Sequence, residues 1–301
     1  MAVPLATVAI LSIGDMGAAN TRSESTQQRA RASNIELLTS DVDLCNQADY
    51  VLSIVPQKDA LSVANRIVAA VNDVTFAARP HPLYFLDLNA VSPQTARNTA
   101  ELFATSASTI KFIDGGIISG PPKLKDDGSW TRPRLVVSGP VKVNEGPSGE
   151  HFASTVNIQH IDATIGSASA LKMCFAAMSK GFAAIAIQSF TTAQRFGLVD
   201  NLEELLDEYN PTFARSANRL LPSMPPKAYR WVQEMLEIAE TFELDGHFSK
   251  EENIFRPISE LYTLVAHGTE LGNEQTDNRQ RGKTSKDVAT LMTQGIDQRW
   301  S

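Results

Sequence analysis

The sequence predicts an α/β fold with a doubly wound, mostly parallel sheet in its first half, followed by an all-α region. Between residues 7 and 138, short apolar segments rich in β-branched residues alternate with amphipathic segments of helical period. A turn containing two glycines directly follows the first apolar segment. Beyond residue 166 the apolar residues recur only at helical spacing. We therefore expect a sheet-based domain at 1–165 and an all-α domain at 166–301.

Composition narrows the class of protein. The chain has 301 residues, of which 43% are hydrophobic and 20% charged, as in ordinary water-soluble proteins. Its net charge of −7 and the lack of a Lys/Arg-rich run argue against nucleic acid as a partner. Two cysteines indicate a reduced, cytoplasmic protein, and five scattered histidines form no metal motif, so we expect no metal.

The first apolar segment, residues 8–13, is expected to be a buried strand rather than a signal peptide, because no basic residue precedes it. It leads into Gly14 and Gly17, a G-x-G-x-x-G pattern with Ser12 in the first glycine position. Glycine lets the backbone approach a ligand closely, and a helix beginning there would offer its N-terminus to a pyrophosphate. A tight turn without a ligand is the alternative.

The segment after Gly17 is unusually short. Parallel strands need a crossover of about a dozen residues or more, usually a helix. Here residues 18–23 are polar, a helix-like run covers 24–33, and the next apolar run is 35–38. Either the first unit is compact, or a helix and a strand that such a sheet normally contains are missing.

The elements that follow alternate regularly. We expect helix 41–48 with Asp41 as its N-cap, strand 50–55, helix 59–71, strand 83–88, a helix opened by Ser92 and Pro93, strand 110–113, a Gly/Pro-rich loop 114–122 and strand 134–138. In such sheets ligands bind at the carboxyl ends of the strands. The loops at 12–17, 55–56, 89 and 114–122 should therefore converge on one crevice.

The second half reads as helices at 167–196, 202–209, 211–221, 227–242, 249–267 and 285–299. Ser249 and Glu252 form a capping box that predicts a helix start at residue 249. The helix at 167–196 is as long and apolar as a membrane span, but its two lysines, serines and many alanines favour a buried central helix. We accordingly expect no membrane partner.

Lys172 is the first candidate catalytic residue. Apolar residues surround it on every face of its helix, and a helix that is apolar all round is buried. Burial lowers the pKa of a lysine unless it is paired, and such an amine can act as a general base. The alternative, a lysine whose charged end reaches solvent at the domain edge, is equally compatible with the sequence. Lys180 lies in similar surroundings but nearer Gly181, and there a non-catalytic, structural lysine is the stronger interpretation.

Two further segments could bind ligands. The loop 114–122 contains Gly115, Gly116 and Gly120, whose backbone N–H groups could hold a carboxylate, although such loops are more often plain turns. Asn89 follows the strand 83–88 and could hydrogen-bond a nicotinamide amide, or could simply be a turn residue.

Five motifs in a fixed order make the chain resemble the β-hydroxyacid dehydrogenase / 6-phosphogluconate dehydrogenase-like superfamily, in the branch with a distinct helical, DUF1932-type C-terminal domain. They are the glycine turn ending at Gly17, the strand ending at Pro56, and the segments 87–93, 114–120 and 166–172, the last ending in Lys172. Their combined order and spacing are far more specific than any one of them.

The resemblance implies a Rossmann-type NAD(P)-binding domain, a helical domain that often builds a homodimer, and oxidation of a small-molecule hydroxy acid by hydride transfer. Lys172 would accept the hydroxyl proton, and Ile118, Ser119 and Gly120 would bind the substrate carboxylate. The implied cofactor-binding residues are Ser12, Gly14, Asp15, Met16, Gly17, Arg22, Ser23, Val55, Pro56 and Asn89. A basic residue at position 22 favours NADP as the cofactor, and NAD stays possible.

The sequence departs from the family pattern at several points. Ser12 replaces the first glycine, and Ala176 stands where the family often has an asparagine one turn after the lysine. Against the family, the first helix and second strand are missing between Ala19 and Arg22. A dehydrogenase is therefore weighed against a non-catalytic relative with impaired cofactor binding that serves as a binding or scaffold protein. A phosphotransferase that uses the Gly-rich loop 114–122 is improbable, because this loop contains no G-K-[ST] motif.

Overall fold

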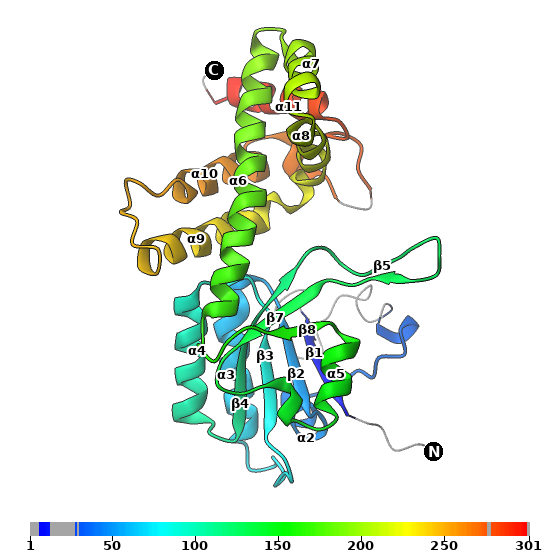
Figure 1. Ribbon diagram of the computed structural model, residues 1–301, viewed down its shortest axis with the longest axis vertical. Helices are drawn as coiled ribbons and strands as arrows, with labels where there is room; N and C mark the ends of the chain where they lie inside the picture. Colours follow the sequence, from blue (N-terminus) through cyan, green and yellow to red (C-terminus); the bar gives the residue numbers. More distant parts are fainter. Residues whose placement is uncertain (1–5, 13–27, 29, 276–277, 300–301) are drawn as a thin grey trace. The chain divides into compact units, whose positions relative to one another are not determined.

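The computed structural model describes residues 6–12, 28, 30–275 and 278–299 (Figure 1). The chain divides into two compact units, residues 1–173 and 174–301, which are described here one at a time. The division falls inside one long helix, whereas the sequence placed the domain boundary at 165/166; that boundary stays a prediction.

The first unit is built on a six-stranded sheet in the order β1-β2-β3-β4-β7-β8 (Figure 1). Neighbouring strands run parallel except β4 and β7, which are antiparallel. The α/β class predicted from the alternating pattern is confirmed. The strands are β1 (Val8–Ser12), β2 (Tyr50–Ile54), β3 (Leu83–Asp87), β4 (Ile110–Ile118), β7 (Arg134–Ser138) and β8 (Ile158–His160).

Helices cover both faces of this sheet, which explains the continuous apolar runs of the central strands. Because side chains alternate along a strand, Phe85 joins the core on one face and Tyr84 the core on the other. The first core is shared with α2 (Asp41–Gln47), α3 (Ala60–Val71) and α4 (Pro93–Ser106), and the second with α5 (Gly149–Thr155). The sheet is therefore doubly wound.

The helix starts follow local capping chemistry. Ser92 Oγ accepts a hydrogen bond from Thr95 N at 3.1 Å and Pro93 is the first helical residue of α4, as predicted. The prediction that Asp41 caps α2 is wrong. The cap is Ser40, whose Oγ accepts from Asp43 N at 3.0 Å, because a serine one position earlier already satisfies that donor.

Strand β4 is longer than the sequence predicts. It does not end at residue 113 but continues to Ile118, and its last five residues pair antiparallel with β7, from Asp114 with Ser138 to Ile118 with Arg134. Half of the expected Gly/Pro-rich loop is thus strand. The short hairpin β5 (Lys123–Leu124) and β6 (Trp130–Thr131), helix α5 and strand β8 are also absent from the prediction.

Strand β1 lies at the edge of the sheet, with β2 on one side. No strand borders its other side within the described part of the chain, and residues 35–38 form none. Ala9 and Leu11 pack into the first core, whereas Val8 and Ile10 point to the opposite face of the sheet. There Val8 is 38% exposed and Ile10 is 44% exposed. Within the described residues, a strand apolar enough for the centre of a parallel sheet therefore has no neighbour on its outer edge, and one of its faces is partly exposed.

The second unit is helical, and its described residues contain no strand. This confirms the all-α prediction for the second half. Its helices are α6 (Ser167–Arg195, which begins in the first unit), α7 (Val199–Tyr209), α8 (Pro211–Ser223), α9 (Ala228–Leu244), α10 (Phe255–His267) and α11 (Ser285–Asp297), with short 3₁₀ turns between them.

Helix α6 is long and apolar enough to cross a membrane, judged by length and composition alone. Core helices of soluble proteins meet the same criterion, and 44% of the most apolar stretch is buried. The expectation of a buried central helix holds for one side of α6 only. The other side carries an exposed apolar stripe consisting of Leu171, Phe175, Met178 and Ile185.

Lys180 of α6 has a structural role in the second unit. Its ammonium forms an ion pair with Glu234 of α9, and both side chains are largely buried. The ring of Trp231 lies 5.2 Å from the Lys180 Nζ, and Tyr262 donates a hydrogen bond to the Lys180 carbonyl at 2.6 Å. A charged pair tolerates such burial only when partners of this kind surround it.

Candidate functional site

A row of polar residues crosses the sheet near the carboxyl ends of its parallel strands. Strand register places Ser53 of β2, Asp87 of β3, Asp114 of β4 and Ser138 of β7 side by side. All four are at most 2% exposed. Buried polar side chains persist only where hydrogen bonds satisfy them, so hydrogen bonds should link the members of this row to one another or to their neighbours.

One half of the row joins the ends of β2 and β3 through Asn89, which is 3% exposed. Its Oδ1 accepts from Val55 N at 2.6 Å, while its Nδ2 donates to Ser53 Oγ at 2.9 Å and to Asp87 Oδ1 at 2.6 Å. The predicted cofactor residues Asn89 and Val55 are therefore in contact with each other. Because the Asn89 amide is engaged on both sides, its visible role is to fix the two strand ends.

The other half of the row holds the start of α6. Asp114 Oδ2 accepts from Ser138 Oγ at 2.9 Å, from Gly166 N at 2.9 Å and from Ser169 N at 3.2 Å. Its Oδ1 accepts from Ser169 Oγ at 2.6 Å, and Ser138 Oγ accepts from Ala168 N at 3.0 Å. The first N–H groups of a helix have no partner within it, and here residues of β4 and β7 satisfy three backbone donors at this end of α6.

Lys172 follows one turn later and lies against β4. Its Nζ donates to the carbonyl of Ile117 at 2.8 Å, and the side chain is half-buried. A Cβ built on Gly116 would lie 2.8 Å from the Cβ of Lys172, so this glycine permits the close approach of helix and strand. The amine is thus held beside the segment predicted to bind substrate.

That segment consists of Ile118, Ser119 and Gly120. Ile118 is the last residue of β4, while Ser119 and Gly120 are exposed. Ser119 has a φ of 88°, a conformation that costs energy for a residue with a side chain and that clusters at ligand sites. The structure brings Lys172 within one residue of this segment, which supports considering them together.

The remaining predicted residues are placed less fully. Gly14, Asp15, Met16, Gly17, Arg22 and Ser23 lie outside the described residues, and Ser12 is described only as the backbone end of β1. Pro56 follows Val55 at the end of β2.

The fit of a nicotinamide cofactor can be tested on the strand ends. Register aligns Ser12 with Ile54 and Ser53 with Asp87, so β1, β2 and β3 end together, as one half of such a site requires. The described residues supply no strand or helix beyond β1 for the other half. Among them no cluster of three His, Cys, Asp or Glu could hold a metal.

Sequence reasoning singled out Lys172 and Asn89 but missed the network of Asp114, Ser138 and Ser169. A signal for it exists, since Asp114 precedes two glycines and Ser138 ends the next long apolar strand. The pairing of these two residues follows from the antiparallel register of β4 and β7, which the sequence did not predict.

Comparisons with known proteins agree with this architecture. Residues 193–265 match DUF1932, a domain of unknown function. An uncharacterized 28.5 kDa protein of Methanothermus fervidus is 30% identical over 187 residues; the match covers 62% of this chain and 64% of that relative. The chain thus spans less than two thirds of the length of this curated relative.

Three solved structures share the fold. A conserved protein of unknown function, described as structurally similar to 3-hydroxyacid dehydrogenases, is 25% identical with a TM-score of 0.54, covering 85% of this chain and 88% of its own. A conserved hypothetical protein of Sinorhizobium meliloti has 20% identity and a TM-score of 0.58, with 97% of each chain covered. The 3-hydroxyisobutyrate dehydrogenase of Mycobacterium tuberculosis, solved with L-serine, is 16% identical with a TM-score of 0.58. The match covers 97% of this chain and 99% of that chain.

The ordered motifs, the doubly wound sheet followed by helices, the DUF1932 match and these structural relatives agree with one another. These findings support the resemblance to the β-hydroxyacid dehydrogenase-like superfamily: the helical C-terminal part matches DUF1932 over residues 193–265, and the chain shares its fold with a protein described as structurally similar to 3-hydroxyacid dehydrogenases.

Proposed function

We propose that this protein is an NADP-dependent oxidoreductase that oxidises a small hydroxy acid, of the 3-hydroxyacid or sugar-acid type, by hydride transfer. The observation that carries the proposal is the placement of Lys172. A lysine from a largely apolar helix is held by Ile117 O at 2.8 Å, beside a strained, exposed segment at the end of β4. A general base must lie within hydrogen-bond reach of the proton it removes, and this placement offers such a base next to a carboxylate site.

In the proposed reaction the substrate carbon loses its hydride and the attached hydroxyl loses its proton, so that a carbonyl forms. A nicotinamide, when bound, supplies the hydride acceptor. Lys172 in its neutral form takes the hydroxyl proton, and Ile118, Ser119 and Gly120 bind the carboxylate through backbone N–H groups and the Ser119 hydroxyl. This arrangement fixes the substrate at both ends, which orients the carbon that reacts.

The cofactor would lie along the ends of β1 to β3. Ser12, Gly14, Asp15, Met16 and Gly17 would bind its pyrophosphate, and Val55, Pro56 and Asn89 would line the nicotinamide side. Arg22 and Ser23 would favour NADP over NAD through the 2′-phosphate. A reduced, cytoplasmic location accords with the two cysteines, which form no disulfide.

A homodimer is part of the proposal, with neither nucleic acid nor membrane as a partner. The supporting observation is the exposed stripe of α6, on which Leu171, Met178 and Ile185 follow at seven-residue intervals and Phe175 lies between them. Met178 is 79% exposed and Ile185 58% exposed. Large apolar side chains aligned in this way on one helix face are typical of a surface that another protein chain covers.

The second candidate is a non-catalytic relative that serves as a binding or scaffold protein. It is favoured by the outer edge of β1, which no strand borders within the described residues, and by Val8 and Ile10 of that strand, which are 38% and 44% exposed. Ala176, in place of the asparagine that the family often has, also favours it. A missing first helix, as the comparison with the family pattern between Ala19 and Arg22 indicates, would deprive a bound pyrophosphate of much of its binding energy.

The deciding experiment is a fluorescence titration of the purified chain with NADPH and with NADH, followed by a hydroxy-acid screen. Micromolar binding that favours NADPH supports the dehydrogenase. Binding of neither, by a protein whose circular dichroism shows it folded, supports the non-catalytic alternative.

A pair of variants then tests the base. Lys172→Ala is expected to abolish turnover while leaving NADPH binding largely intact. Lys111→Ala, which removes an exposed lysine of β4, is the matched control and should keep both properties. Turnover that survives in Lys172→Ala would remove Lys172 from the reaction.

A further inference from the structure

The start of α6 is tied to the sheet by a carboxylate that the reaction itself does not use. Asp114 is 0% exposed and accepts from both backbone and hydroxyl donors around the first turn of α6, more than fifty residues away in sequence. A helix usually takes its N-cap from the residue that precedes it. Here the cap comes from β4, so the capping contact also fixes where the helix lies on that strand.

The same strand holds Lys172. Asp114 and Ile117 are three residues apart on β4, and their partners Ser169 and Lys172 are three residues apart on α6. Helix and strand are therefore joined at two points. Between these points, Gly116 brings the strand so close that a Cβ there would lie 2.8 Å from the Cβ of Lys172. With so little space, a small displacement of the first turn of α6 moves the Lys172 amine.

We propose that Asp114 is a positioning residue for Lys172, acting through the first turn of α6. The inference rests on the proposed function, since the amine that it positions is the proposed base. Ser138 supports the same contact, because its hydroxyl donates to Asp114 and accepts from Ala168 N. Catalytic groups need such support, because a displacement of about 1 Å is enough to lower a rate severely.

Asp114→Asn probes this role with little change of volume. The substitution removes the negative charge, and charge-assisted hydrogen bonds are about twice as strong as neutral ones. The amide oxygen can still accept from Gly166 N and Ser169 N, but the NH₂ group must then face Ser169 Oγ, which donates to Asp114 in the wild type. A loss of about 1 kcal/mol from these contacts makes the first turn open about fivefold more often. Lys172 would then leave Ile117 O more often and become more accessible.

The measurement is the acetylation rate of each lysine by acetic anhydride, across neutral and alkaline pH, with peptide mass spectrometry. In Asp114→Asn we expect Lys172 to react about fivefold faster, with an altered pH profile, while exposed Lys111 on β4 is unchanged. Asp43→Asn is the matched control: this carboxylate of α2 accepts hydrogen bonds from the hydroxyls of Thr39 and Ser40 just before the helix, and its loss should leave Lys172 unaffected.

If Asp114 serves only global stability, the variant will melt earlier but show the wild-type rate and pH profile at Lys172, which overturns the proposal. Should Asp114→Asn fail to fold, Ser169→Ala decides, because it removes only the 2.6 Å contact to Oδ1. A smaller change in the same direction at Lys172 supports the proposal, and no change contradicts it.

The labelling needs neither cofactor nor substrate, so its outcome is separate from that of the proposed function. Loss of NADPH binding, or turnover without Lys172, would refute the dehydrogenase and leave the labelling result standing. Unchanged labelling in a protein that binds NADPH and depends on Lys172 would refute only the role of Asp114.

Discussion

The two cysteines show how position decides the chemistry of one residue type. Cys45 of α2 is 0% exposed, and burial raises the pKa of its thiol to about 12, with a further rise from nearby Asp41 and a smaller opposing effect of Arg79. Cys174 of α6 is exposed. The thiolate is the reactive form of cysteine, so only one of these thiols should react in the native protein.

We predict that an aromatic disulfide reagent modifies one thiol per chain at mildly alkaline pH and two after denaturation. Cys174→Ser should abolish the native reaction, and Cys45→Ser should leave it unchanged. Two equivalents reacting in the native protein would show that α2 opens readily.

At the scale of an element, helix α10 begins later than its capping motif predicts, because a buried side chain holds the chain in a turn. The capping box of Ser249 and Glu252 forms, with Ser249 N donating to Glu252 at 2.8 Å, but α10 begins only at Phe255, so the predicted start at 249 is wrong. Asn253 is the reason. It is 4% exposed, donates to Ala239 O at 2.8 Å, and accepts from Phe255 N at 2.9 Å, which holds the chain in a turn.

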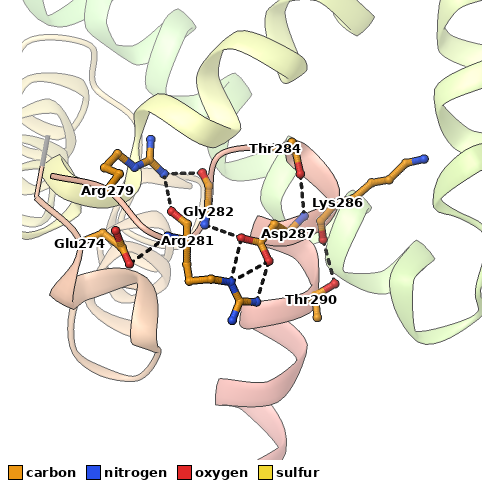
Figure 2. A network of polar contacts seen from close by, with 8 residues as sticks. All are labelled: Glu274, Arg279, Arg281, Gly282, Thr284, Lys286, Asp287 and Thr290. Carbon is orange, nitrogen blue, oxygen red and sulfur yellow. Dashed lines mark hydrogen bonds and ion pairs between the residues drawn. The ribbon is translucent and has the colours of Figure 1, made fainter. Parts of the chain in front are cut away.

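Helix α11 begins in a polar network centred on Asp287 (Figure 2). Thr284 Oγ1 caps the helix by accepting from Asp287 N at 3.1 Å. The Asp287 carboxylate accepts from Arg281 Nη2 at 2.7 Å and from Gly282 N at 2.5 Å, and Arg279 donates to the Gly282 carbonyl. The hydrogen bond from Arg281 is the main reason that the pKa of Asp287 lies below its usual 3.8.

This lowered pKa predicts a pH-dependent stability. A carboxyl group whose pKa falls on folding contributes stability above its unfolded pKa, near 3.8, and loses that contribution as the pH falls through the folded value. Asp287→Asn should therefore destabilise the protein by about 1 kcal/mol at neutral pH and by much less in strong acid. Urea unfolding at several pH values measures this difference.

The control is Asp207→Asn, which alters an exposed carboxylate of α7. It should change the free energy of unfolding little at either pH. An Asp287→Asn effect that is equally large in acid would show that packing, rather than the carboxylate charge, stabilises this loop.

At the scale of the whole molecule, the exposed stripe of α6 predicts how the chain assembles. A charge placed within an apolar interface must be desolvated without a partner, whereas on a free surface it costs little. Because Met178 is 79% exposed within one chain, Met178→Glu should leave the fold intact and dissociate the proposed dimer.

Sedimentation equilibrium should report twice the chain mass of 32.7 kDa for the wild type and the single mass for Met178→Glu. Gln188→Glu, an exposed position of the same helix, is the matched control and should remain dimeric. A wild-type protein that sediments as a monomer would contradict the homodimer.

The sequence by itself determined the fold class, most strand and helix positions, and Lys172 as the residue to examine. These features follow from local rules, since apolar periodicity and capping residues act over a few neighbours. It also indicated that a helix and a strand are missing after Gly17; this segment lies outside the described residues, so that expectation stays a prediction.

Only the tertiary structure decided that β4 continues through two glycines to pair with β7, and that Asp114 and Ser138 thereby hold the start of α6. Those contacts join residues that are 24 and 52 positions apart in the sequence. Register between distant strands sets them, and it depends on the packing of the whole sheet rather than on any local pattern. The same dependence on packing explains why Asn89, a plausible ligand residue in sequence, has its amide bound between two strand ends.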